Sequence, residues 1–282
     1  IKATLDEASA VLGQDLWAMI NGEHAETINE TVNTQPLMLA AGIATYRAYL
    51  EAGGKEPSVM AGHSLGEYTA LVVAGSLSFV DALKLVRLRA ELMQSAVPQG
   101  TGSMAAILGL DDDAVRAVCA EAAQGEVVEA VNFNSPGQVV IAGSIAAVER
   151  AIETAKAKGA KRALPLPVSV PSHCLLMKPA AEKLAEALKA VDIQPPKIPV
   201  IHNADVASYN NAEQIKDALV RQLYSPVRWT ETVNALVAQG IIQSAECGPG
   251  KVLAGLAKRI NKEASCSALT NTEQVSAFIA AH

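Results

Sequence analysis

The sequence predicts an α/β protein with a larger body and a smaller inserted unit, and two patterns support this. Strand and helix patterns alternate along the 282 residues, and one run between residues 103 and 168 follows the order βαββαβ. Hydrophobic residues make up 50% of the chain and aromatic residues only 4%. Such an aliphatic, alanine-rich composition is typical of helices packed on strands, and the length allows one large domain or two smaller ones.

The first hundred residues predict the opening part of the body. Apolar periodicity indicates helices, and one short apolar run indicates a buried strand. The helices are expected over residues 1–20, 35–52, 67–74 and 79–96, and the strand over residues 58–61. The run from Pro98 to Gly102 is the clearest boundary signal.

The next segment predicts the inserted unit. Strands are expected over residues 103–110, 127–132, 138–143 and 162–168, with helices over 112–124 and 146–158 and a hairpin at 134–137. The order βαββαβ is that of a ferredoxin-like unit. We therefore expect a ferredoxin-like subdomain over residues 101–169, inserted into a body formed by residues 1–100 and 170–282.

The rest of the chain returns to the body after a proline-rich stretch. Its expected elements are helices over residues 179–191, 212–223 and 229–238, strands over 198–202 and 241–245, and a last long helix after the turn at 247–251.

Composition excludes several classes of function. The net charge of −6 argues against nucleic acid and a membrane surface as partners. No apolar run approaches the ~20 residues of a membrane span, and the opening residues indicate a helix and not a signal peptide. The four cysteines form no C-x-x-C pair, so we expect no metal site and a reducing, cytoplasmic location.

The residues Gly62-His63-Ser64-Leu65-Gly66 fit the pattern G-x-S-x-G between a predicted strand and a predicted helix. This is the context of a nucleophile elbow. The two glycines are expected to let the strand and helix approach, and Ser64 is the candidate nucleophile. The Leu65 N–H at the helix start would stabilise an oxyanion. The alternative is a plain structural turn.

A serine nucleophile needs a base, and the chain has five histidines. His173 lies in a proline-stiffened loop and is favoured over His202, which ends a predicted strand and is the alternative. His63 is expected to pack or orient, and His24 and His282 are expected to be bystanders. No acidic residue stands out as a third catalytic member.

Arg89 lies in the apolar stripe of the helix predicted over residues 79–96, whereas Arg87 lies toward its polar face. A buried arginine requires a carboxylate partner. The partner is either an internal Asp or Glu, or a substrate carboxylate held by both guanidinium nitrogens. The residues alone leave these two alternatives even.

Seven segments occur in an order that is specific to one family. They are Thr34-Gln35-Pro36, Gly62-His63-Ser64-Leu65-Gly66-Glu67, Arg87-Leu88-Arg89, the stretch Val-Asn-Phe-Asn-Ser-Pro-Gly-Gln-Val-Val at 131–140, Val-Ser-Val-Pro-Ser-His at 168–173, Arg221-Gln222-Leu223-Tyr224 and Gly248-Pro249-Gly250-Lys251. Over nearly its whole length the chain resembles bacterial malonyl-CoA:acyl-carrier-protein transacylases of type II fatty acid synthesis. The resemblance implies a hydrolase-like α/β body with a mostly parallel sheet and the inserted ferredoxin-like subdomain.

The resemblance also implies roles for individual residues. Ser64 would be the acylated nucleophile, His173 its base, and a Gln222 carbonyl oxygen the group that orients His173. Arg89 would hold the free carboxylate of malonate. The further substrate-binding residues implied by the resemblance are Gln35, Met93 and Asn132.

The implied reaction is ping-pong transfer of a malonyl group from malonyl-CoA to the phosphopantetheine thiol of acyl carrier protein. No cofactor is implied, because malonyl-CoA is a substrate, and we expect a monomer. The carrier protein is acidic, so docking would use basic residues such as Lys161, Arg162, Lys258 and Arg259.

One departure concerns the beginning of the chain. The family usually opens with a strand and a Phe-Pro-Gly-Gln-Gly loop, whose glutamine amide supplies a second oxyanion donor, and this sequence begins after that segment. Two rival functions remain, the first suggested by the G-x-S-x-G pattern and the second only by the missing opening segment. One is a serine esterase or thioesterase, which shares G-x-S-x-G, and the other is a chain that binds acyl-CoA or carrier protein without turnover.

Overall fold

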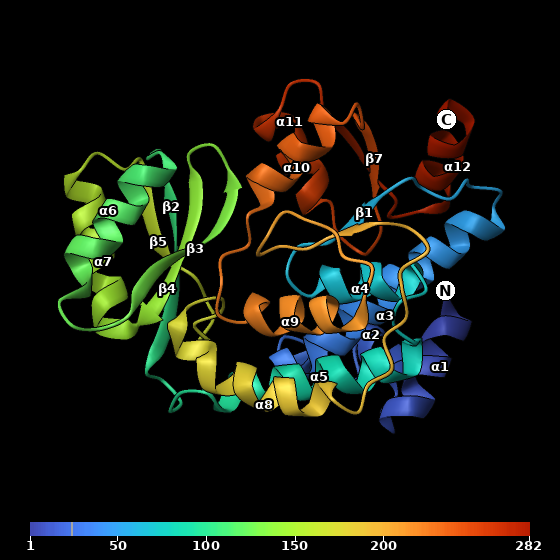
Figure 1. Cartoon of the computed structure of the whole chain (residues 1–282), viewed down its shortest axis with the longest axis horizontal. Coiled ribbons are helices and arrows are strands. Elements are labelled where there is room, and N and C mark those ends of the chain that lie inside the picture. The colour runs from blue at the N-terminus through green and yellow to red at the C-terminus, as the bar shows by residue number, and fades with distance from the viewer. Residues whose placement is uncertain (24) are drawn as a thin grey trace.

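The inserted unit lies beside the body in the computed structural model, which describes residues 1–23 and 25–282 (Figure 1). His24, expected to be a bystander, lies outside the described residues. The unit contains a four-stranded antiparallel sheet of order β3-β4-β2-β5. Its strands are β2 (Gly102–Leu108), β3 (Val128–Ser135), β4 (Gln138–Ser144) and β5 (Arg162–Pro165). This strand order is that of a ferredoxin-like fold, as predicted.

Two helices, α6 (Asp112–Ala123) and α7 (Ile145–Ala157), cover one face of this sheet. Side chains alternate between faces along a strand. Ala105 and Ile107 of β2 therefore join the core under these helices, whereas Met104 joins a second cluster on the other face. That second cluster includes Cys174 from the body, so the back of the small sheet packs against the segment that follows His173.

The strands of the body are short and pair in parallel. β1 (Met60–Ala61) pairs with β6 (Val200–Ile201), and β7 (Gln243–Glu246) pairs with β8 (Ser265–Ala268). The largest core cluster lies among the surrounding helices. These helices are α1 (Lys2–Leu12), α2 (Leu16–Ile20), α3 (Thr31–Glu51), α4 (Gly66–Val73), α5 (Phe79–Ser95), α8 (Lys178–Leu188) and α9 (Ala212–Gln222); α10 (Trp229–Ala238), α11 (Val252–Ile260) and α12 (Thr272–Ala281) pack near β7 and β8 (Figure 1).

The predicted α/β class is confirmed, two predicted helices are wrong, and a third is present with a different start. The helix expected over 1–20 is broken at Gly13, whose φ of 64° ends α1, and the Asp15 side chain then caps α2 by accepting from the Ala18 N–H at 2.9 Å. The second helix begins at Thr31 and not at 35, so Pro36 lies inside it.

The last long helix is also wrong, because the chain forms α11, then β8, then α12. The Asn271 side chain accepts from the Gln274 N–H at 2.9 Å and starts the final helix separately. The division of the chain at residues 101 and 169 stays a prediction.

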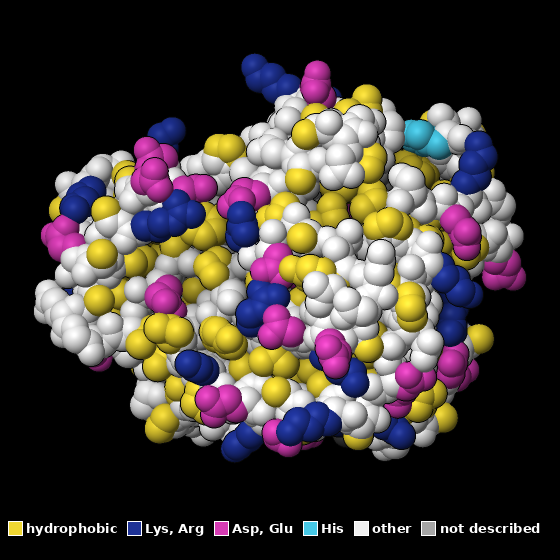
Figure 2. Space-filling view, viewed as in Figure 1, with side chains coloured by type: hydrophobic (Ala, Val, Ile, Leu, Met, Phe, Trp, Pro, Cys, Tyr) yellow, Lys and Arg dark blue, Asp and Glu magenta, His cyan; other side chains and the backbone are white. Residues whose placement is uncertain are grey.

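Surface charge on the face in Figure 2 is mixed, with Lys and Arg side chains interspersed among Asp and Glu. One surface ion pair joins Lys158 to Glu121 at 2.5 Å. Within residues 1–23 and 25–282, no helix combines the length and the apolar character needed to cross a membrane.

Candidate active site

The predicted elbow lies at the end of β1 and leads into α4. Ser64 has a φ of 52°, in the left-handed region that side chains rarely adopt. A Cβ atom at Gly62 would lie 2.0 Å from the backbone carbon and oxygen of Gly66, so the close approach requires a glycine there. A Cβ atom at Gly66 would meet nothing within 4 Å. The expectation that both glycines are needed for the approach is therefore wrong for Gly66.

Ser64 and His173 lie in direct contact. The Ser64 Oγ is 2.8 Å from the His173 Nε2, and the His173 Nδ1 is 2.8 Å from the backbone oxygen of Gln222. A carbonyl oxygen only accepts, so Nδ1 carries the proton and Nε2 is left to accept from the serine hydroxyl. The arrangement is that of an activated nucleophile and its base, with a main-chain carbonyl orienting the imidazole.

His173 is 3% exposed and also has a positive φ, of 64°. Its N–H donates to the Leu223 oxygen at 3.1 Å, which fixes the loop against the end of α9. Burial, and then the charge of Arg89, lower the pKa of His173 to about 3. The free imidazole is therefore neutral near pH 7, as a general base must be.

His202, the alternative base, does not contact Ser64. Its Nδ1 donates to the Glu67 Oε1 at 2.6 Å in a wholly buried pair. His63 also stays away from the serine hydroxyl: its Nε2 is 2.8 Å from the Asn134 Oδ1, and its ring packs 5.6 Å from the Trp229 ring. Both histidines have structural contacts, which agrees with the expectation that His63 packs or orients.

Arg89 is 1% exposed and contacts the same hydroxyl. Its Nη2 donates to the Ser64 Oγ at 3.2 Å and to the Gln222 Oε1 at 3.1 Å. Its Nη1 donates to the Gln35 Oε1 at 2.6 Å. Among the described residues, no carboxylate lies within ion-pair distance of this guanidinium. The buried cation therefore contacts only neutral groups, which disfavours the internal-carboxylate alternative.

Gln35 and Met93 lie next to Arg89. The Gln35 Nε2 lies 3.6 Å from the Met93 Sδ, and Met93 follows Arg89 by one turn of α5, so both side chains share a helix face. Both residues are buried. Two of the three further substrate-binding candidates are thus placed beside Arg89.

The third candidate, Asn132, comes from the small sheet. It occupies the same face of β3 as Asn134, which contacts His63 next to the nucleophile. Its Oδ1 is buried and has no hydrogen-bond partner among the described residues. A buried acceptor without a partner costs about 1–3 kcal/mol, so this oxygen is available to a ligand N–H.

The candidate hydrogen-bond donor to the oxyanion is the Leu65 N–H. Leu65 precedes α4 in helical conformation, where the first N–H groups of a helix are free of helical partners. The Ser64 N–H, by contrast, donates to the Asn203 Oδ1 at 2.8 Å. Since the serine amide is already bound, the helix start is left to stabilise negative charge.

Sequence reasoning missed three functions of side chains around the elbow. Glu67 and Asn203 received no role, and Gln222 was expected to act through its carbonyl alone. Glu67 was visible as the residue after G-x-S-x-G, and Asn203 as a polar residue at a strand end, where α/β proteins place their sites. In the described part of the chain, no group of His, Cys, Asp or Glu could hold a metal ion.

Fold and site together define an acyl transferase. Residues 3–271 match the family model described as "Acyl transferase domain", so the chain belongs to that family. Within it, the chain belongs with the malonyl CoA-acyl carrier protein transacylases. It is 56% identical over 279 residues to the Malonyl CoA-acyl carrier protein transacylase of Escherichia coli K12, covering 99% of this chain and 90% of that protein.

Solved structures support the same family assignment. The acyl-carrier-protein S-malonyltransferase of Burkholderia pseudomallei 1710b matches with a TM-score of 0.97 and 57% identity, covering 99% of this chain and 91% of that one. A malonyl-transacylase in complex with its type II PKS acyl-carrier protein matches with a TM-score of 0.98 and 55% identity, covering 100% and 91%.

Proposed function

We propose that this protein transfers a malonyl group from malonyl-CoA to the phosphopantetheine thiol of acyl carrier protein through a malonyl ester of Ser64. One observation carries the proposal. The Ser64 hydroxyl lies between a base and a buried cation, 2.8 Å from the His173 Nε2 and 3.2 Å from the Arg89 Nη2. A nucleophile in that position selects an acyl group that carries its own carboxylate.

The first half-reaction forms the ester. His173 accepts the hydroxyl proton at Nε2 while Ser64 Oγ attacks the thioester carbonyl. The Leu65 N–H stabilises the oxyanion, and the Gln222 carbonyl stabilises the imidazolium through Nδ1–H. The carbon–sulfur bond then breaks, and the imidazolium returns its proton to the departing CoA thiolate.

The second half-reaction transfers the malonyl group. His173 accepts the proton of the carrier-protein thiol, the sulfur attacks the ester carbonyl, and Ser64 Oγ leaves with the proton from Nε2. Arg89 would hold the malonyl carboxylate through both steps with two guanidinium N–H groups. Gln35, Met93 and Asn132 would complete the substrate contacts.

The carrier protein as acceptor is supported by the relatives, because one of the matching structures is a malonyl-transacylase in complex with its acyl-carrier protein. We also propose a cytoplasmic monomer. The contacts among Ser64, His173 and Arg89 form without a second chain. The four cysteines are unpaired, as in a reducing compartment.

The test is intact mass after incubation with malonyl-CoA. We expect one added malonyl group, absent from Ser64→Ala, which is lost when carrier protein bearing phosphopantetheine is added and then appears on that protein. Release of free malonate without carrier protein would instead indicate a thioesterase. No adduct on folded protein would contradict the proposed transfer.

A further inference from the structure

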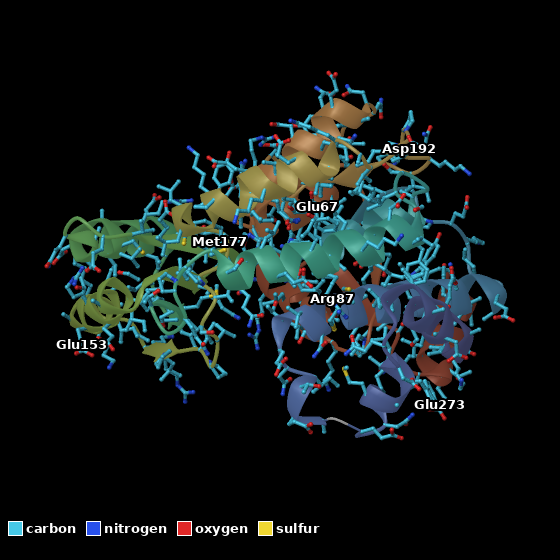
Figure 3. All side chains as sticks on the ribbon, turned by 90° about the horizontal axis from the view of Figure 1, so that it is seen from below. Glu67, Arg87, Glu153, Met177, Asp192 and Glu273 are labelled. Atoms are coloured by element: carbon cyan, nitrogen blue, oxygen red, sulfur yellow. The ribbon has the colours of Figure 1, made fainter. Side chains whose placement is uncertain are left out.

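Three residues after the nucleophile stands a buried carboxylate, Glu67, that the reaction steps above do not use. Glu67 is 0% exposed, and Figure 3 places it in the interior of the body, far from the labelled surface acids at either end. Its Oε1 accepts from the His202 Nδ1 at 2.6 Å, and its Oε2 accepts from the Asn203 N–H at 2.8 Å. A buried carboxylate persists only where donors surround it, so this cluster is a built structure.

Asn203 bonds both sides of the elbow. Its Oδ1 accepts from the Ser64 N–H at 2.8 Å, and its Nδ2 donates to the Gly62 oxygen at 2.7 Å. The side chain therefore bridges the residue that enters the turn and the residue at its apex. Because Ser64 has a φ of 52°, such a bridge opposes relaxation of the turn.

The backbone of Asn203 is itself held from both sides. Glu67 accepts from its N–H, and its oxygen accepts from the Arg228 N–H at 3.3 Å. The loop that follows is tied to α9 by two Arg221 contacts with the Asp205 carboxylate, at 2.5 and 2.8 Å. Asn203 is thus a rigid mount, as accurate positioning requires.

Glu67 also sets the direction of the Gln222 amide. The Gln222 Nε2 donates to the Glu67 Oε2 at 3.1 Å and to the Ser64 oxygen at 2.8 Å. With the nitrogen held there, the amide oxygen faces the other way and accepts from the Arg89 Nη2 at 3.1 Å. A flipped amide would turn an NH₂ group toward the guanidinium, where donor would meet donor.

We infer that Glu67 and Asn203 are positioning residues with separable tasks: Asn203 holds the strained Ser64 turn, and Glu67 holds Asn203 and the Gln222 amide that orients Arg89. This inference rests on the proposed malonyl transfer for its kinetic readouts. The Asn203 contact acts on the nucleophile, so its loss slows every acyl group. The contact between Glu67 and Gln222 acts on Arg89, which would hold the malonyl carboxylate. Its loss therefore slows acylation by malonyl-CoA more than acylation by acetyl-CoA.

The kinetic test compares the rates at which folded protein is acylated by malonyl-CoA and by acetyl-CoA, followed by intact mass. Asn203→Leu keeps the branched shape of the side chain and removes both elbow bonds, together with a longer contact of 3.4 Å from the Gln222 Nε2 to the Asn203 Oδ1. The Gln222 Nε2 keeps its bonds to the Ser64 oxygen and to Glu67. We expect both rates to fall by about 10-fold to 100-fold, the range for a small misplacement of reacting groups. The ratio of the two rates should stay within about twofold. Asn203→Ser, too short to reach either partner, should do the same if the leucine variant folds poorly.

Two Glu67 variants separate hydrogen bonding from charge. Glu67→Gln keeps an acceptor for Asn203 and Gln222, and His202 can move its proton to Nε2 and accept from the new NH₂ group, so we expect most activity to remain. Glu67→Met keeps neither and should lower the malonyl rate more than the acetyl rate. If Glu67→Gln and Glu67→Met lowered the acylation rates equally, the loss would come from the missing charge and not from the missing hydrogen bonds. That result would overturn the positioning role of Glu67.

Ser76→Ala is the matched control. Ser76 lies beyond the carboxyl-terminal end of α4 and is 1% exposed. Its substitution removes one partly buried hydrogen bond, from the Ser76 hydroxyl to the Gln194 oxygen at 2.7 Å. Both rates should stay within about twofold of the parent, the scatter expected of independent sites. If Asn203→Leu and Glu67→Met also behave like this control, the inference is wrong.

Hydrogen exchange tests the inference without activity. In the parent, the Ser64 amide is bound to Asn203, so we expect its exchange to accelerate at least tenfold in Asn203→Leu and to be unchanged in Ser76→Ala. An amide that stays protected would overturn the inference. A parent that forms no malonyl adduct would defeat the proposed function, and exchange would still decide the role of Asn203.

Discussion

Replacement of Arg89 by methionine is the sharpest perturbation of acyl-group selection. The side chain is buried, its guanidinium donates hydrogen bonds to Gln35, Ser64 and Gln222, and its Cζ lies 5.4 Å from the centre of the Tyr68 ring. Methionine keeps much of the length and apolar stem but no donor. An acetyl group differs from malonyl by the carboxylate alone, so comparing the two donors isolates the clamp.

The magnitude follows from the lost contacts. A charge-assisted hydrogen bond contributes about 1.5–3 kcal/mol, so two bonds to a carboxylate contribute about 3–6 kcal/mol. At about 1.4 kcal/mol per factor of ten, kcat/KM for malonyl-CoA should fall by about 10²–10⁴. Acetyl-CoA has no carboxylate to lose, and its rate should change by less than about tenfold.

The assay is transfer to carrier protein with each donor, and Arg87→Met is the control. Arg87 lies two residues earlier on α5 and donates to the Gln14 Oε1 at 2.5 Å, away from the serine. This control should keep the malonyl preference of the parent. Equal losses for malonyl and acetyl in Arg89→Met would refute the clamp and leave Arg89 as a support for the serine alone.

Two further predictions concern pH and the elbow. Because burial lowers the pKa of His173 to about 3, Ser64 acylation should show no inflection near pH 6.5 between pH 5 and 8, which quenched intact-mass time courses would check. The same shift makes the unfolded state bind more protons below about pH 6.5, so the parent should lose more thermal stability than His173→Gln between pH 7 and 5. Gly62→Ala should prevent stable folding, since its Cβ would lie 2.0 Å from the Gly66 backbone. Gly66→Ala should keep or raise the melting temperature, because alanine favours the helix by about 1 kcal/mol; thermal unfolding by circular dichroism compares the two.

A catalytic residue could be predicted from the sequence where a short local pattern marks its position. Ser64 was visible because strand, turn and helix are adjacent in sequence. His173 and His202 could only be ranked, since their distances to the serine depend on how separate segments pack. The His173 contact with a Gln222 carbonyl came only from resemblance, because every residue has a backbone oxygen and no side-chain pattern marks this one.

The network beneath the elbow and some of the strands were beyond sequence reasoning for related reasons. Glu67 and Asn203 are 136 positions apart, and each is an ordinary polar residue until the fold brings them together. β8 has the sequence Ser-Cys-Ser-Ala, with no β-branched residue and no clear alternation, so pairing with β7 and not propensity makes it a strand. The small sheet was predictable because the apolar runs of β2, β3 and β4 are longer than those of the body strands, and because helix and turn signals separate the strands in the order βαββαβ.

The positive φ angles of Ser64 and His173, 52° and 64°, have a consequence for engineering. Both halves of the nucleophile–base pair occupy a conformation that glycine adopts freely and that costs other residues about 1 kcal/mol or more each. A library selected only for resistance to heat would therefore favour glycine at the two positions that catalysis cannot spare. Stabilised variants of this fold should be screened for turnover from the first round, because stability favours glycine at these two positions and catalysis requires the serine and the histidine.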